Sequence, residues 1–370
     1  MVKVLSIFGT RPEAIKMAPV LRELARHPER VRSRVCVSGQ HRQMLDQVLE
    51  LFGIRPDHDL DVMRPDQSPQ RVAAAVLAGL EPLFERERPD WVLVQGDTTT
   101  VAAAALAAFY AGVRVGHVEA GLRTHNLRQP FPEELNRRLV DGVSELLFAP
   151  TETARSNLLA EGVPPGRIHV TGNSGIDALL ETARRPYAWE AGPLAPLPRD
   201  RRLVLVTAHR RESFGAPLAR VCEALVELAA RYAATVQFVF PVHPNARVAE
   251  PVRAALDGRE GLTLLRPLDY FSLVQLMKRA VLVLTDSGGL QEEAPSLGVP
   301  VLVLRDVTER PEGVEAGNAR LVGTDTAAIV AATSRLLDDP TEHARMARAI
   351  NPYGDGHAAE RIVRLLVDSP

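Results

Sequence analysis

Cysteine is scarce in this sequence. The two that occur, Cys36 and Cys222, lie in different halves of the chain, so they fit neither a disulfide framework nor the paired spacing of a zinc site. Isolated cysteines are typical of a protein kept in a reducing compartment. We therefore expect a cytoplasmic protein.

Long hydrophobic runs and an excess of one charge are also missing. The longest uncharged stretch, residues 98–113, is rich in alanine and shorter than the roughly 20 residues of a membrane span. The apolar run at residues 4–8 is too short for a signal peptide. The 44 basic and 46 acidic residues leave a net charge of -2, so no overall field attracts nucleic acid or an anionic membrane. We expect a soluble protein that binds neither nucleic acid nor a membrane. Any polyanionic ligand would have to be bound by basic groups at its own site.

Two common nucleotide-binding fingerprints are absent as well. Neither G-x-G-x-x-G nor G-x-x-x-x-G-K-S/T occurs, which removes the main support for a nicotinamide or P-loop site. Residues 57–61 (DHDLD) have the spacing of a metal-bound sugar-nucleotide motif. Because they lie in a polar connection and not at the end of a strand, we predict a solvated loop there. We predict no metal site.

Short β-branched runs do occur, in alternation with longer helical patterns. This alternation is typical of a parallel, doubly wound α/β fold, and 370 residues suffice for two domains of ~150 residues each. In the first half we predict strands at residues 2–8, 34–38, 91–95, 114–119, 146–149 and 168–171. In the second half we predict them at residues 203–207, 236–241, 262–265, 281–285 and 299–304.

A proline-rich stretch separates the two halves of this pattern. We predict an N-terminal Rossmann-like domain at 1–182, a linker at 183–201, a C-terminal Rossmann-like domain at 202–352 and a C-terminal helix within 353–370. If the two domains face each other across a cleft, their strand C-termini and helix N-termini point toward a shared ligand.

Acidic side chains follow two successive strands of the first half. Asp97 comes after one strand, and Glu119 ends the next within a cluster that also holds His117 and Arg123. Glu133 opens a later helix. Asp97 taken alone is better explained as a helix N-cap, and the helix dipole alone explains Glu133 about as well as a site does. If the two strands are neighbours, Asp97 and Glu119 lie at one rim, where Glu133 could join them.

Candidate anion-binding groups follow strands in both halves. Arg11 lies in the turn after the first predicted strand, and Lys16, one of three lysines in the chain, follows in the first helix. In the second half His209 stands beside arginines at a strand end, where a structural histidine is the alternative, and His243 ends the next strand. Residues 285–293 (TDSGGLQEE) combine a strand end, small residues and a helical Glu, a pattern that favours a phosphate and a ribose diol.

Five strings together resemble the non-hydrolysing UDP-N-acetylglucosamine 2-epimerases. They occur in order over essentially the whole chain: GTRPEAIK (9–16), GQHRQML (39–45), GHVEAGLRT (116–124), HRRE (209–212) and DSGGLQEEAP (286–295). The resemblance implies a glycosyltransferase-B type fold of two Rossmann-like domains, with a C-terminal helix that returns to the first. It also implies interconversion of UDP-N-acetylglucosamine and UDP-N-acetylmannosamine for surface polysaccharide precursors, through elimination of UDP to 2-acetamidoglucal and its re-addition, without a cofactor.

The resemblance also implies roles for individual residues. The family's acid/base carboxylates match Asp97, Glu119 and Glu133, without an assignment to either face of C2, and its phosphate-contacting histidine matches His209. Contacts to the phosphates and cleft match Arg11, Lys16, Ser287, Gly288, Gly289 and Arg310. Glu293 matches the ribose-binding carboxylate, and uracil is placed on residues 268–273. Leu273 stands where relatives often carry an aromatic ring, so Phe271 or Tyr270 is an alternative stacking partner.

A second, activating substrate site occurs in some relatives. Its side chains match Gln40, Gln43, Gln67 and His243, but Asp66 stands where those relatives carry an arginine. An anion beside a diphosphate weakens binding, so substrate activation stays open. Dimers are usual in the family, and we expect a homodimer.

Three other functions fit the same residues. A glycosyltransferase of the same fold would share the Ser-Gly-Gly and Glu site but transfer the sugar to an acceptor. A hydrolysing epimerase would let water reach the glycal, and a non-catalytic sugar-nucleotide sensor would not need three carboxylates. The native substrate could also be a further-modified UDP-acetamido sugar.

Overall fold

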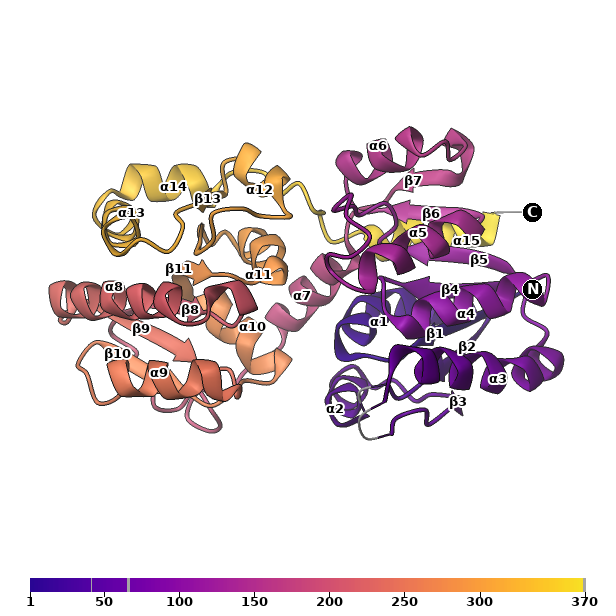
Figure 1. The fold of residues 1–370 in the computed structure, drawn as a ribbon, viewed down its shortest axis with the longest axis horizontal. Coiled ribbons are helices and arrows are strands. Elements are labelled where there is room, and N and C mark those ends of the chain that lie inside the picture. Colours follow the sequence, from indigo (N-terminus) through magenta and orange to yellow (C-terminus); the bar gives the residue numbers. More distant parts are fainter. Residues whose placement is uncertain (41, 65–66, 369–370) are drawn as a thin grey trace. The chain divides into compact units, whose positions relative to one another are not determined.

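The computed structural model describes residues 1–40, 42–64 and 67–368. The chain divides into two compact units (Figure 1): unit 1 comprises Met1–Ala178 with Tyr353–Pro370, and unit 2 comprises Leu179–Pro352. The boundary falls within a helix, α7 (Ser174–Arg184), so the stretch predicted as a linker, 183–201, lies within unit 2.

Unit 1 is built on a seven-stranded parallel sheet in the order β3-β2-β1-β4-β5-β6-β7. Its strands are β1 (Val2–Phe8), β2 (Val31–Val37), β3 (His58–Asp59), β4 (Trp91–Gln95), β5 (Arg114–Val118), β6 (Leu146–Ala149) and β7 (Ile168–Val170). Every residue of β4, with the sequence WVLVQ, is buried, as expected for a central parallel strand that is covered on both faces.

Helices connect these strands, and side-chain caps start several of them. They are α1 (Arg11–Ala25), α2 (Arg42–Phe52), α3 (Pro69–Glu87), α4 (Thr99–Tyr110), α5 (Glu133–Val143), α6 (Glu152–Ala160), η1 (Pro165–Arg167), α7 and α15 (Ala358–Asp368). Ser68, Thr98 and Thr151 cap α3, α4 and α6. The C-terminal helix α15 packs against α1. The carboxylate of Asp177 accepts hydrogen bonds from the first two amides of α15, at 3.3 and 2.9 Å.

Unit 2 repeats the design with a six-stranded parallel sheet in the order β10-β9-β8-β11-β12-β13. The strands are β8 (Arg202–Thr207), β9 (Val236–Pro241), β10 (Leu262–Leu265), β11 (Ala280–Thr285), β12 (Val301–Val303) and β13 (Ala319–Leu321). The helices are η2 (Arg211–Ser213), α8 (Ala216–Tyr232), α9 (Ala246–Leu256), α10 (Tyr270–Arg279), α11 (Gly288–Glu293), η3 (Ala294–Leu297), α12 (Pro311–Glu315), α13 (Thr326–Asp338) and α14 (Pro340–Ala347).

The prediction of two Rossmann-like, doubly wound sheets is confirmed.

Both cysteines are buried free thiols. Burial raises the pKa of Cys36 to about 12 and that of Cys222 to about 11. Within the described residues, no helix combines the length and apolar character that a membrane span requires.

The loop predicted at residues 57–61 is partly wrong, because the backbone there forms β3 at the edge of the sheet. His58 pairs with Cys36 of β2, and Asp59 with Val37. The acids of this segment form ion pairs: Asp57 with Arg34, and Asp59 with Arg42. In the part of the chain that the structure describes, no group of three His, Cys, Asp or Glu side chains is placed to hold a metal.

Gly121, which follows β5, is expected to tolerate no side chain. Its φ is +84°, and a Cβ there would lie 2.3 Å from the carbonyl oxygen of Ala154. Gly121→Ala should lower the free energy of unfolding by about 2–5 kcal/mol. Alanine is strained in the left-handed conformation, and its Cβ would clash with backbone atoms that must move to make room. The matched control is Gly162→Ala, since Gly162 has φ +83° but nothing within 4 Å. Urea unfolding of both variants separates the cost of the clash from the cost of the left-handed backbone. Equal losses of unfolding free energy in the two variants would contradict the clash at Gly121.

Candidate active site

The carboxylates Asp97 and Glu119 follow neighbouring strands of unit 1. β4 and β5 are paired in parallel, with Gln95 opposite Val118. Asp97 stands two residues beyond the end of β4, and Glu119 directly follows β5. Because parallel strands end at the same edge of a sheet, both acids lie at the carboxyl edge, where α/β folds usually bind ligands.

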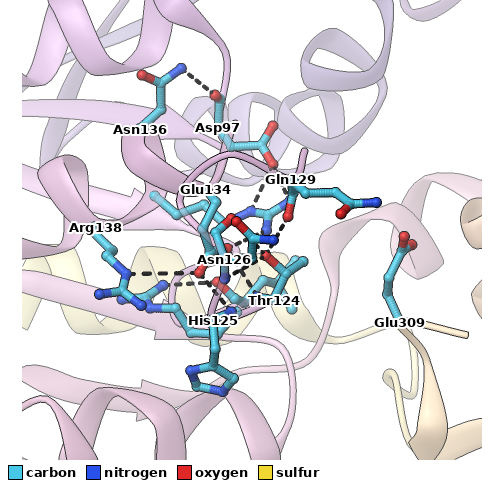
Figure 2. A network of polar contacts seen from close by, with 12 residues as sticks. Asp97, Thr124, His125, Asn126, Gln129, Glu134, Asn136, Arg138 and Glu309 are labelled. Carbon is cyan, nitrogen blue, oxygen red and sulfur yellow. Dashed lines mark hydrogen bonds and ion pairs between the residues drawn. The ribbon is translucent and has the colours of Figure 1, made fainter. Parts of the chain in front are cut away.

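Asp97 is held from the neighbouring helix α5. Its carboxylate forms an ion pair with Arg137, whose Nε and second terminal nitrogen lie 2.9 and 2.8 Å from Oδ2. The amide of Asn136 donates to the backbone oxygen of Asp97 at 2.8 Å (Figure 2). The alternative interpretation of Asp97 as an N-cap is wrong, because Thr98 caps α4. The Asp97 carboxylate therefore has no role in starting the helix.

Glu119 is held by an ammonium and an amide. Lys16 Nζ lies 2.5 Å from Oε1, and Gln95 Nε2 lies 2.5 Å from Oε2. The carboxylate side chain is only 8% exposed. The backbone of Glu119 is left-handed, with φ +69°, a conformation that costs about 1–3 kcal/mol for a residue with a side chain. Lys16, expected at the phosphates, is thus bound to an acid of unit 1.

Two acids begin α5, and they have different surroundings. Glu134 is fully buried and ties down the preceding loop: it accepts from the backbone amides of Thr124 and His125 at 3.0 and 3.1 Å (Figure 2). Glu133 has a buried oxygen, Oε2, with no hydrogen-bond partner among the described residues. A buried carboxylate oxygen normally has a partner, so Glu133 is the acid of this pair that remains available to a ligand.

The backbone amides in the turn after β1 already have a hydrogen-bond partner within the chain. Arg11 is the first residue of α1 and not part of the loop. The amides of Gly9 and Thr10 donate to the carboxylate of Glu13 at 2.5 and 2.9 Å, and burial raises the pKa of this acid. These two amides are therefore not free to bind an anion, and the anion-binding role of Arg11 at this helix start stays a prediction.

In unit 2, His209 and Asp286 follow the neighbouring strands β8 and β11. Asp286 is fully buried and accepts from the backbone amides of His209 and Arg210 at 2.7 and 2.8 Å. His209 Nδ1 lies 3.2 Å from the other Asp286 oxygen, and the ring stacks on His243 at 5.5 Å. Burial lowers the pKa of His209, against the opposing charge of Asp286.

Two arginines flank the glycines that begin α11. A Cβ on Gly288 would lie 3.6 Å from the guanidinium of Arg210 and 3.9 Å from that of Arg310. Arg310 also pairs with Glu292, and Arg210 Nε is buried without a hydrogen-bond partner among the described residues. Ser287 is the N-cap residue of the helix. Positively charged side chains beside small residues form an environment that suits a phosphate.

Comparison with known proteins supplies the family. A family model described as UDP-N-acetylglucosamine 2-epimerase matches residues 22–367. Over 370 residues the chain is 53% identical to the UDP-N-acetylglucosamine 2-epimerase of Yersinia pestis and 52% identical to that of Salmonella typhimurium, covering 98% of both partners in each comparison.

The chain belongs to the UDP-N-acetylglucosamine 2-epimerase family. It is an enzyme of the isomerase class. The crystal structure of the UDP-GlcNAc 2-epimerase of Neisseria meningitidis, bound to UDP-GlcNAc, is similar with a TM-score of 0.89 at 45% identity, over 100% of both chains. The predicted glycosyltransferase-B type fold class is confirmed.

The side chains predicted to bind the nucleoside, Phe271, Leu273 and Glu293, lie on α10 and α11. Phe271 packs edge-on against Tyr187, with ring centroids 5.2 Å apart. Leu273 follows on the same helix and is partly buried, and Glu293 is the last residue of α11. The N-cap of α10 is Asp269, which accepts from the amide of Ser272 at 2.8 Å and thereby orders the segment predicted to hold uracil.

The residues of the second site implied by resemblance have local partners. Gln40 accepts from the hydroxyl of Thr100 at 2.7 Å, and Gln67 from the amide of Arg64 at 3.1 Å. His243 is the ring stacked on His209. Asp66 and the side chain of Gln43 lie outside the described residues. Substrate activation of this epimerase stays open, as it is from the sequence.

Sequence reasoning missed the residues that hold the candidate acids and bases. Arg137, Asn136 and Gln95 were not singled out, because nothing in their spacing shows which strand end they face. Arg210 was noted only as a neighbour of His209, although an Arg-Arg pair three residues beyond the end of a strand is a usable signal for an anion site.

Proposed function

We propose that this chain interconverts UDP-N-acetylglucosamine and UDP-N-acetylmannosamine by inverting C2. The observation that carries the proposal is the pair of acids at adjacent strand ends, Asp97 and Glu119, each fixed by a cation. Inversion requires groups that remove a proton from one face of C2 and deliver one to the other. Glu133 adds a third candidate, since one of its oxygens is buried and has no hydrogen-bond partner in the described part of the chain.

The proposed reaction is an elimination followed by re-addition. One carboxylate takes the C2 proton as the C1–O bond breaks, and the electrons of the C2–H bond form the C1–C2 double bond of 2-acetamidoglucal. UDP leaves with the bonding pair. UDP then adds back to C1 while an acid protonates the opposite face of C2. Because C2–H is a very weak acid, the route depends on stabilising the diphosphate as it leaves.

Groups of unit 2 are suited to that stabilisation. We assign the diphosphate to His209, Arg210, Arg310 and the Ser287–Gly289 backbone, because cations and small residues gather there. Arg11 is a further candidate from unit 1. Glu293 is assigned to the ribose hydroxyls, and the segment 268–273, with Phe271 and Leu273, to uracil. We also propose that the product feeds surface polysaccharide synthesis, since a nucleotide sugar is the activated donor form of its hexose.

Incubation with UDP-N-acetylglucosamine in deuterium oxide, without acceptor or added metal, tests the proposal. The expected result is a mixture of both UDP-sugars with deuterium at C2, which NMR detects. Free sugar and UDP would identify a hydrolysing epimerase instead. Unchanged substrate would contradict the proposal and favour a transferase or a sensor.

The affinity for UDP-N-acetylglucosamine should rise as pH falls. Burial lowers the pKa of His209, so the free ring is largely neutral above its ordinary value of ~6.5. A bound diphosphate favours the imidazolium, so binding takes up a proton. Kd is measured by calorimetry in an inactive Asp97→Asn background. It should fall by about fivefold from about pH 8 to about pH 5.5, because a hydrogen bond gains ~1 kcal/mol when it becomes charge-assisted. The same slope in an added His209→Gln variant would contradict this assignment.

We also propose that the chain forms a homodimer through unit 1. Large apolar side chains are exposed on the adjacent helices α4 and α5: Phe109, Tyr110, Leu135 and Leu139. Large exposed apolar side chains gathered on neighbouring elements are typical of association surfaces. The double variant Tyr110→Asp, Leu139→Asp should raise the dimer Kd by about 10²-fold or more, measured by ultracentrifugation against a subunit mass of 40.4 kDa. Ile350→Asp, at an exposed apolar residue of unit 2, is the control and should change nothing.

A further inference from the structure

His117 occupies a buried position that the chemistry above does not use. It lies on β5, two residues before Glu119, and its side chain has no exposed surface. Nδ1 is 2.6 Å from Oδ1 of Asp141 on α5, and Nε2 is 2.8 Å from the backbone oxygen of Gly96. Both ring nitrogens therefore have oxygen partners.

These partners determine the protonation of the ring. A backbone carbonyl only accepts, so Nε2 must carry a proton. The other Asp141 oxygen accepts from Arg123 at 2.7 Å and from the amide of Gly121 at 3.3 Å. Burial alone would raise the pKa of Asp141, but its contacts with His117 and Arg123 hold it below its usual value. The Nε2 proton therefore faces the Gly96 carbonyl, and Asp141 holds the opposite edge of the ring.

Arg123 extends this chain of contacts. Its buried guanidinium bonds to Asp141 and, at 2.7 Å, to Glu161, whose side chain is 32% exposed. A buried cation persists only when it is paired in this way. The chain of contacts joins β5, α5 and the end of α6, so the imidazole ring is fixed on its Asp141 side.

The other side of the ring fixes a peptide next to the candidate acids. Gly96 has φ +81°, and its carbonyl belongs to the peptide that leads into Asp97. A Cβ on Gly96 would lie 3.8 Å from the Glu119 carboxylate. The backbone at Gly96 thus runs between the two acids, and the hydrogen bond from Nε2 sets the orientation of that backbone.

We propose that His117 is a positioning residue: through the Gly96 carbonyl it fixes Asp97 relative to Glu119. This inference rests on the proposed function, in which both carboxylates transfer protons at C2. The contacts from α5 restrain the Asp97 carboxylate, whereas His117 restrains the peptide from which that side chain extends.

The first test needs no variant to be active. In the full chain labelled with ¹⁵N-histidine, which has ten histidines, the His117 ring should show a slowly exchanging proton on Nε2, with a through-space contact to Gly96. A His117 ring without a proton on Nε2 would overturn the proposal. Because the measurement uses no substrate, its outcome is independent of the proposed reaction.

The second test compares two amides that each replace one ring nitrogen. His117→Gln places its N–H near the position of Nε2 and retains a donor for Gly96. His117→Asn places it near Nδ1 and retains only the donor for Asp141. His117→Asn should lower kcat by about 10²-fold, the scale of a displaced catalytic group, and His117→Gln by about tenfold or less. KM and the Kd for UDP should stay within about twofold in both.

Equal kcat values in the two amide variants would show that the Gly96 contact does not matter for catalysis and would overturn the proposal. His169→Gln is the matched control: His169 is a partly buried histidine of the same sheet, on β7, and this change should leave kcat unaltered. If the unmodified protein performs no epimerisation, the proposed function fails, while the NMR result still decides the state of His117.

Discussion

Asp97→Asn is expected to lower kcat for epimerisation of UDP-N-acetylglucosamine by about 10²–10⁴-fold, the usual contribution of a positioned general acid or base. Asparagine has nearly the same shape and keeps an oxygen toward Arg137, 2.8 Å from the carboxylate, but it cannot exchange a proton with C2. KM should change by less than about threefold, because the lost interaction belongs to the transition state. Chromatographic separation of the two UDP-sugars gives the rates.

A second measurement separates lost chemistry from lost folding. Asp90→Asn is the matched control, since Asp90 is exposed and its carboxylate accepts a hydrogen bond from the backbone amide of Lys3 at 2.8 Å. This control should keep full activity. An Asp97→Asn enzyme that still exchanges deuterium into C2 at the normal rate would remove Asp97 from the proton-transfer steps and leave Glu119 and Glu133 as the acids.

The fold was largely predictable where a strand is central to its sheet. β4 has the predicted bounds, Trp91–Gln95, because a buried parallel strand reads as a continuous apolar run. β3 and β13 were missed for the opposite reason. β3 has two residues, His58 and Asp59, and exists only because β2 offers an open edge. β13 has the sequence ARL, which carries no pattern by itself.

The candidate site was predictable in its strand-end residues and not in what holds them. Asp97 and Glu119 follow strands, so the parallel order of β4 and β5 is enough to bring them to one edge. The left-handed backbone of Glu119, with φ +69°, leaves no sequence signal, because such a conformation is usually signalled by glycine. The contacts of Arg137 and His117 depend on which face α5 turns toward the sheet, and sequence spacing does not determine that.

The distribution of charge in unit 1 separates two kinds of acid. Asp97 and Glu119 are each paired with one cation at the strand ends. Glu134 and Asp141, on the same helix α5, are buried and accept backbone amides that shape the loops after β5. The first pair keeps its carboxylates near the carboxyl edge of the sheet, whereas the second pair is committed to structure. Replacing a residue of the second pair should therefore damage the fold before it damages the chemistry.

Lys16→Met is expected to lower kcat by about 10- to 100-fold, the equivalent of the 1.5–3 kcal/mol of one charge-assisted hydrogen bond. Lys16 Nζ lies 2.5 Å from the Glu119 carboxylate, so the loss falls on the acid and its proton transfer. A lysine bound to the diphosphate predicts the reverse pattern: a weaker Kd for UDP with a smaller change in kcat. Steady-state kinetics together with UDP calorimetry distinguish the two roles. Lys3→Met, which removes a lysine at the start of β1, is the control for a general loss of positive charge, and an equal fall in its kcat would contradict the pairing of Lys16 with Glu119 as the cause.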